Sequence, residues 1–192
     1  VSQQDEIERT SWRVRECQYG EMDATSHNMI HTSHAMAGMA TPEQMAELAA
    51  SESTAFDRLF LQLPQHNDFR AWVDLRSDSR DFLSPWDPVW SEEHLTRRNF
   101  TARVYWAQRA VKNGSGCPLF LVRKTDQALV GAVTLDNIRR GPAQAGTLGY
   151  WTGERFARQG YMREAVTGLV AHAFRKLDLS RIEAACLPEN QA

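Results

Sequence analysis

The sequence has few cysteines, no long apolar run and almost no net charge. Its three cysteines, Cys17, Cys117 and Cys186, lie far apart and lack metal-ligand spacing, so we expect free or buried thiols in a reducing, cytoplasmic compartment. No apolar run approaches the roughly 18 residues of a membrane-spanning helix, and the acidic N-terminal residues show no signal-peptide pattern. A net charge of −2 favours neither nucleic acid nor an anionic membrane as a partner.

The charge is divided unevenly along the chain. Residues 1–63 hold 4 Lys/Arg against 10 Asp/Glu, a net of −6, whereas residues 64–192 hold 18 against 14, a net of +4. A length of 192 residues suits one domain, or one domain with a fragment attached. We therefore predict two parts: a helical and linker segment over residues 1–63, and an α/β (α+β) domain over residues 64–192.

The first forty residues contain little regular patterning. Residues 1–20 are weakly amphipathic and predict a helix that ends near Gly20. Further on, His27, His31 and His34 stand among methionines and small polar residues. Such a set could bind a soft or borderline metal such as copper; the favoured interpretation is a linker without a metal site, because Ser, Thr and Gly oppose a stable helix there.

A second helix is predicted from Thr41 to Leu63. Thr41 is placed as N-cap, Pro42 fits the first helical position and Gln44 completes a capping box. Apolar residues then recur at intervals of three and four until Pro64. The alternative is that Leu59–Leu63 forms a short strand, because its pattern before proline fits both periods; we favour the helix.

The rest of the chain alternates helical and strand patterns. Helices are predicted at Asp68–Arg76 and from an N-cap at Ser91 to Gly114, with the proline-containing residues 84–90 as a loop between them. The later elements are predicted as strands Pro118–Arg123, Leu129–Leu135 and Gln144–Thr152, helix Tyr161–Leu177 and strand Ser180–Leu187. The last three form a βαβ unit with two parallel strands. We expect strand Ser180–Leu187 to be an uncovered sheet edge.

The loop between the strand at 144–152 and the helix at 161–177 is the main candidate site. It carries Arg155, Arg158 and Gly160 directly before a helix N-terminus, and such a loop can bind an anion through backbone N–H groups and the helix dipole. Neither a dinucleotide-binding Gly-x-Gly-x-x-Gly nor a Walker loop is present. The expected ligand is a phosphorylated small molecule, and the alternative is a plain turn with solvated arginines.

Four segments carry a resemblance to a known family: Ser84–Pro88, Leu148–Trp151, Arg158–Ala165 and Arg181–Asn190. In this order they resemble the GNAT superfamily of acetyl-CoA-dependent N-acetyltransferases. The greatest similarity is to the RimJ/RimL type, which acts on N-terminal amines of ribosomal proteins. The resemblance implies a mixed sheet with flanking helices, with acetyl-CoA as co-substrate and a peptide or protein N-terminus as acceptor. Ala157 departs from the pattern, because Gln or Arg is usual there.

The same resemblance implies roles for individual residues. The backbone of Arg158, Gln159, Gly160, Tyr161 and Met162 would bind the cofactor pyrophosphate, Tyr150 and Trp151 would pair with pantetheine, and Asn190 would lie near the thiol end. The strands at 144–152 and 180–187 would splay apart around the thioester. Glu183 is the candidate base that takes the amine proton, and Glu154 is a weaker one. For Glu183 the favoured alternative is an exposed strand residue that pairs with Arg181 or a neighbour.

Two further expectations concern completeness. Members of the family continue past the residue matching Asn190 with a helix and a hairpin, so the domain is expected to be incomplete at its C-terminus. Residues 4–63 resemble part of a different family, the domain of unknown function numbered three hundred and five, through Gly38–Leu48 and Phe56–Leu63. The predicted function is N-acetyl transfer. The alternatives are a fusion of truncated fragments without turnover, and a helical module that binds a metal or a partner.

Overall fold

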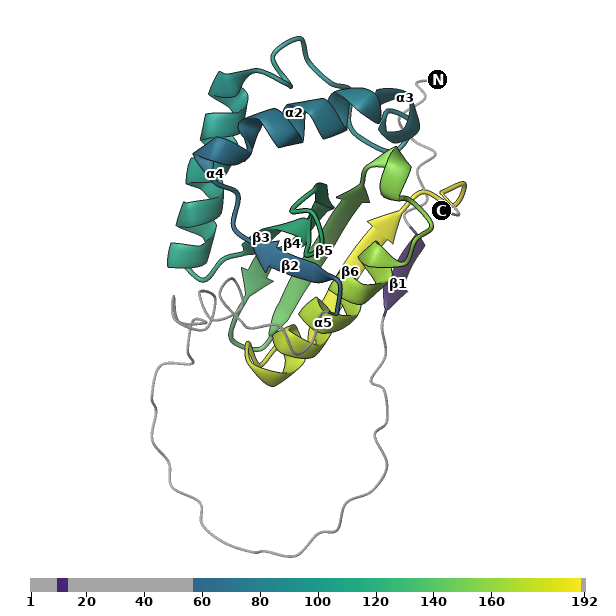
Figure 1. The fold of residues 1–192 in the computed structure, drawn as a ribbon. Coiled ribbons are helices and arrows are strands. Elements are labelled where there is room, and N and C mark those ends of the chain that lie inside the picture. Colours follow the sequence, from purple (N-terminus) through teal and green to yellow (C-terminus); the bar gives the residue numbers. More distant parts are fainter. Residues whose placement is uncertain (1–9, 14–56, 191–192) are drawn as a thin grey trace, which may run out of the picture.

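The computed structural model describes residues 10–13 and 57–190 of the chain. These residues form one sheet in the order β1-β6-β5-β4-β3-β2 (Figure 1). In this sheet β5 and β6 run parallel and the other neighbouring strands run antiparallel. The strands are β1 (Thr10–Arg13), β2 (Leu59–Gln62), β3 (Cys117–Arg123), β4 (Leu129–Arg139), β5 (Ala145–Thr152) and β6 (Arg181–Cys186).

Helices cover the middle of the sheet. Figure 1 shows α2 and α3 along the top of the view, α4 on its left side, and α5 lying across the lower part of the sheet. Residues Cys117 to Val122 of β3 are all buried, which requires cover on both faces of that strand. The helices are α2 (Phe69–Asp78), α3 (Arg80–Leu83), α4 (Arg97–Lys112) and α5 (Tyr161–Arg175), with short 3₁₀ turns η1 (His66–Asp68) and η2 (Glu154–Phe156). The predicted mixed α+β architecture is confirmed.

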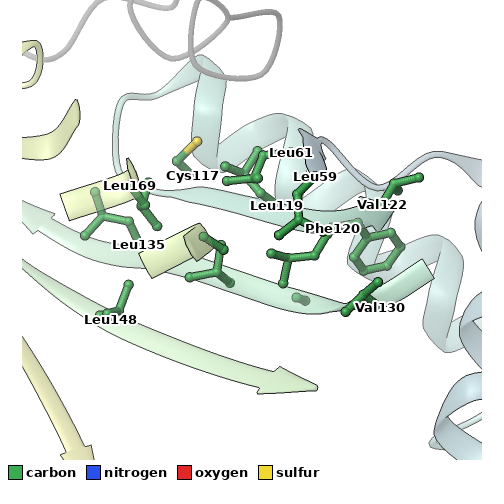
Figure 2. Close-up of a cluster of buried hydrophobic side chains, with 14 of the residues drawn as sticks. Leu59, Leu61, Cys117, Leu119, Phe120, Val122, Val130, Leu135, Leu148 and Leu169 are labelled. Carbon is green, nitrogen blue, oxygen red and sulfur yellow. The ribbon is translucent and has the colours of Figure 1, made fainter. Parts of the chain in front are cut away.

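The expectation of a helix at Leu59–Leu63 is wrong, because Leu59–Gln62 is strand β2. Leu59 and Leu61 are buried while Phe60 is 43% exposed, the alternation of a strand rather than a helical face. Leu61 lies opposite Leu121 of β3, and Figure 2 shows both β2 leucines among the buried side chains. Burying each leucine contributes about 2 kcal/mol to the free energy of folding. Pairing with β3 also provides hydrogen-bond partners for the backbone N–H and C=O groups of β2. The rest of the predicted helix lies outside the described residues.

The expectation of an uncovered last strand is also wrong. Strand β1 pairs antiparallel with β6, with Thr10 opposite Cys186 and Arg13 opposite Glu183. The backbone groups on that side of β6 therefore meet a partner strand, as an edge in a folded protein generally requires. Because Thr10–Arg13 is a strand, the predicted helix over residues 1–20 is wrong at these positions, and its remaining residues lie outside the described part.

The other elements agree with the sequence patterns. Helix α2, both strands of the β3–β4 hairpin, β5, α5 and β6 all occur, and β5 and β6 are parallel as predicted. Helix α4 begins later than expected: Thr96, not Ser91, is its N-cap, and its hydroxyl oxygen accepts from the Asn99 N–H at 3.3 Å. Within residues 10–13 and 57–190, no helix combines the length and apolar character needed to cross a membrane.

Candidate functional site

The two parallel strands part in the middle of the sheet. Their pairing ends at Leu148 and Ala184, although β5 continues to Thr152 and β6 to Cys186. A cavity of about 360 Å³ opens where they separate. It is lined by Phe82, Leu83, Trp86, Asp87, Leu148, Gly149, Tyr150, Trp151, Thr152, Ala157, Arg158, Met162, Ala185, Cys186, Leu187 and Asn190. The predicted separation of these strands is therefore present, and we call the space between them the β5–β6 cavity.

One wall of the cavity is the end of β5. Residues Gly149 to Thr152 still pair with β4 on one side, but their other side no longer meets β6. A strand edge of this kind can hydrogen-bond an extended ligand as if it were another strand. Tyr150, which is 52% exposed, and Trp151 line the cavity here.

The same wall continues through the loop into α5. Arg158 and Gly160 both take left-handed backbone angles, with φ of 58° and 80°, and Gly160 is the N-cap of α5. The first turn of a helix has N–H groups without intrahelical partners and carries the positive end of the dipole. Arg158 and Met162 line the cavity beside it. The chain thus places the N-terminus of α5, a helix end that is able to bind an anion, beside the separated strands.

Arg58, which the sequence patterns did not single out, fixes this loop from outside. Its guanidinium donates to the Gln159 carbonyl at 3.0 Å, lies 4.5 Å from the centre of the Tyr161 ring and pairs with Glu164 at 2.8 Å. A cation–π contact and a charge-assisted hydrogen bond hold it there. No local signal predicts this, because Arg58 and the loop are about a hundred residues apart.

The opposite wall is the loop at residues 84–90, which contributes Trp86 and Asp87 to the cavity. Behind it lies Arg76 of α2, which is only 5% exposed. The Arg76 Nη2 donates to Asp87 Oδ2 at 2.5 Å and contacts His94 Nε2 at 3.0 Å. Its guanidinium stacks 4.4 Å from the ring centre of Trp90 and 4.7 Å from that of Trp151. Arg76 therefore ties this loop to β5.

Burial lowers the pKa of two groups in this cluster. Desolvation lowers the pKa of Arg76, an effect that Asp87 opposes. Burial also lowers the pKa of His94, and the positive charges of Arg76 and Arg103 lower it further. Because Arg76 can only donate, His94 Nε2 accepts, which fixes the neutral ring with its proton on Nδ1. The cluster thus holds a neutral His94 at pH 7.

The structure brings together most of the predicted site residues. Tyr150, Trp151, Arg158, Met162 and Asn190 line the β5–β6 cavity. Three other predicted ligand-binding residues lie between Arg158 and Met162 in the chain but do not line the cavity: Gln159, Gly160 and Tyr161. Cys186, a free and half-buried cysteine, also lines the cavity.

Glu183 lies outside the lining of the cavity. Its carboxylate pairs with Arg181 at 2.9 Å and with Arg139 at 3.6 Å, which matches the ion-pair alternative for this residue. Glu154 is an exposed residue of η2 and also lies outside the lining. The described residues contain no cluster of three or more His, Cys, Asp or Glu that could hold a metal, and His27, His31 and His34 lie outside them.

Comparisons with known proteins agree with this geometry. Residues 58–192 match the family model of the Acetyltransferase (GNAT) domain, and residues 1–68 match that of the Domain of unknown function (DUF305). The chain is 30% identical over 135 residues to the [Ribosomal protein uS5]-alanine N-acetyltransferase of Escherichia coli (strain K12), covering 70% of each protein. It is also 30% identical over 118 residues to the Probable N-acetyltransferase YjcK of Bacillus subtilis (strain 168), covering 62% of this chain and 65% of that one.

Solved structures show the same fold. The ribosomal-protein-S5-alanine acetyltransferase from Vibrio fischeri superposes with a TM-score of 0.66 at 27% identity, covering 71% of this chain and 74% of that one. RimJ of Mycobacterium smegmatis, solved with CoA-disulfide, gives a TM-score of 0.64 at 22% identity, covering 71% and 69%.

Proposed function

The chain belongs to the GNAT acetyltransferase family, and from this premise we propose that it transfers acetyl from acetyl-CoA to the N-terminal amine of a protein. Members of this family use acetyl-CoA as co-substrate. The acceptor class follows the relatives in Escherichia coli and Vibrio fischeri, whose names specify an alanine of a ribosomal protein. We propose the same class of acceptor here: a ribosomal-protein or peptide N-terminus.

One observation carries the proposal: the separated ends of β5 and β6 open beside the N-terminus of α5. In the proposed complex, backbone N–H groups from Arg158 to Met162 bind the pyrophosphate. The free side of β5 at Tyr150 and Trp151 pairs with the pantetheine arm, and Asn190 binds near the sulfur. The thioester then lies between the strands, where a backbone donor stabilises the oxyanion.

The proposed reaction is direct transfer. The neutral amine attacks the thioester carbonyl, a C–N bond forms, the C–S bond breaks, and CoA leaves as a thiolate that takes up a proton. The amine loses its own proton during this sequence. The ion pairs of Glu183 with Arg139 and Arg181 do not favour it as direct base, so our proposal passes the proton to water in the cavity.

Cysteine labelling tests cofactor binding directly. Cys186 lines the cavity, whereas Cys117 is buried and burial raises the pKa of its thiol to about 12. In a Cys17→Ser background, iodoacetamide at pH 8 is expected to label Cys186 alone. Saturating acetyl-CoA should slow that labelling at least about tenfold, because a bound ligand excludes the reagent. Unchanged labelling at millimolar acetyl-CoA would argue against the proposed cofactor site.

Turnover is tested separately by mass spectrometry. The chain with acetyl-CoA and an alanine-initiated peptide should yield a peptide heavier by one acetyl group, while the same peptide with a blocked amine should stay unchanged. Protection of Cys186 without any acetylated product, over a panel of N-terminal residues, would retain cofactor binding and reject the transfer.

A further inference from the structure

The loop at residues 84–90 places a single carboxylate in the β5–β6 cavity. Among the described residues that line it, Asp87 is the only Asp or Glu, and Arg158 is the only Lys or Arg. The two come from different segments: Arg158 from the loop before α5, and Asp87 from the loop at residues 84–90. A cavity with one basic and one acidic side suits two ligands with different charges.

The contacts of Asp87 leave half of its carboxylate available. Its Oδ2 accepts from Arg76 Nη2 at 2.5 Å and from Trp90 Nε1 at 3.1 Å. Both hydrogen bonds end on Oδ2, no hydrogen bond from the described residues ends on Oδ1, and the side chain is 23% exposed. A carboxylate can accept up to about four hydrogen bonds, so Asp87 has acceptor capacity beyond those two donors.

The orientation of Asp87 is fixed rather than adaptable. Arg76 is buried and stacks against both Trp90 and Trp151, so the guanidinium cannot follow a different position of the carboxylate without losing those contacts. Trp151 itself lines the cavity on the β5 wall. Arg76, which contacts both Asp87 and Trp151, therefore links the carboxylate to the proposed thioester-binding strand β5.

We propose that Asp87 binds the acceptor amine, with Oδ1 accepting one of its N–H groups, and that Arg76 is the residue that positions Asp87. This inference rests on the proposed function and adds to it the group that recognises the acceptor. A carboxylate accepts from an amine or ammonium through a charge-assisted hydrogen bond. The adjacent positive charge of Arg76 limits how strongly Asp87 stabilises the ammonium form, so the amine can still lose its proton before attack.

The test compares Asp87→Asn with Asp81→Asn, which removes the same charge from an exposed position of α3. The probes are acetyl-CoA alone and an alanine-initiated peptide. Asp87→Asn is expected to raise the KM for the peptide by about 10- to 100-fold, the loss for one hydrogen bond to a charged group. The Kd for acetyl-CoA should stay within about twofold, and Asp81→Asn should leave all constants unchanged. Asp87→Glu should recover part of the peptide affinity.

A second measurement guards against a merely structural effect. A desamino peptide, with hydrogen in place of the amine, should bind the wild-type chain more weakly than the amine-bearing peptide does. The Asp87→Asn variant should bind the two peptides equally well. The role of Asp87 is overturned if Asp87→Asn keeps the wild-type KM for the peptide. It is also overturned if the KM for the peptide and the Kd for acetyl-CoA rise in parallel. If the wild-type chain binds no acetyl-CoA, the proposed function fails as well; if it transfers acetyl while Asp87→Asn behaves normally, only this role fails.

Discussion

The two walls of the β5–β6 cavity are built in different ways. The wall formed by β5, its loop and the start of α5 uses backbone groups from one continuous stretch, residues 148–162. The wall formed by the loop at residues 84–90 is held by side chains behind it: Arg76 from α2 contacts Asp87, Trp90 and His94 from the segment between α3 and α4. A backbone wall depends on conformations that few residues adopt, whereas a side-chain wall depends on a few irreplaceable contacts. Substitutions should therefore damage the two walls differently.

The largest effect is expected at the centre of the side-chain wall. Arg76→Met leaves Asp87 without its cation and removes the group stacked between two tryptophans, and we expect a loss of about 3 kcal/mol in the free energy of unfolding. Arg76→Lys should lose less, because the charge remains while the planar stacking is lost. Chemical denaturation measures both variants. A loss below about 1 kcal/mol for Arg76→Met would mean that this wall does not depend on Arg76.

A smaller effect is expected in the backbone wall. Gly160 has φ of 80°, and Gly160→Ala should cost about 1–2 kcal/mol, the penalty for a left-handed residue with a Cβ. The variant should also weaken acetyl-CoA binding more than Arg76→Lys does, because it distorts the start of α5. Gly149→Ala is the control for stability, since a Cβ there meets nothing within 4 Å. Equal unfolding curves for Gly160→Ala and the wild-type chain would contradict the prediction.

The smallest effect is expected from pH. Because the pKa of His94 is lower in the folded chain than the unfolded value of 6.5, the unfolded state binds more protons between those two values. The neutral ring therefore stabilises the fold above about pH 6.5, and this stabilisation is lost as the pH falls through the folded pKa. Protonation also removes the acceptor that Nε2 offers to Arg76.

His94→Gln separates this contribution from those of other titrating groups. Glutamine can accept from Arg76 but does not titrate, so the loss of stability between pH 7 and pH 5 should be shallower than in the wild-type chain. The comparison is made by denaturant unfolding at each pH. Identical slopes for the two proteins would show that His94 does not couple pH to this wall.

The same contrast explains what could be predicted from sequence. The backbone wall is local: an apolar strand, a glycine-bearing loop and an amphipathic helix follow one another, so the pattern alone predicts Arg155, Arg158 and Gly160 beside a helix N-terminus. The βαβ unit and its parallel strands follow from the same run. Short-range patterns suffice where the interacting groups are neighbours in the chain.

The side-chain wall has no such local signal. Arg76 was one more charged residue at the end of a predicted helix, and nothing in its neighbourhood indicates that it is buried between Trp90 and Trp151. Strand β2 was misassigned for a related reason, because Leu59 and Leu61 fit both periods and only their partners on β3 decide. Arg58 was missed because its contacts with the α5 loop join distant parts of the chain.

The pairing of β1 with β6 has a consequence for the order of folding. Thr10 lies opposite Cys186, so these two strands meet only after nearly all of the chain between them has been synthesised. Contacts of such separation carry a large loop-closure cost and tend to form late. The hairpin of β3 and β4 can form from residues that are close in sequence. Strand β1, in contrast, cannot pair until β6 has emerged from the ribosome. Closure of this sheet edge by β1 therefore has to wait for the synthesis of β6, although β1 itself is made first.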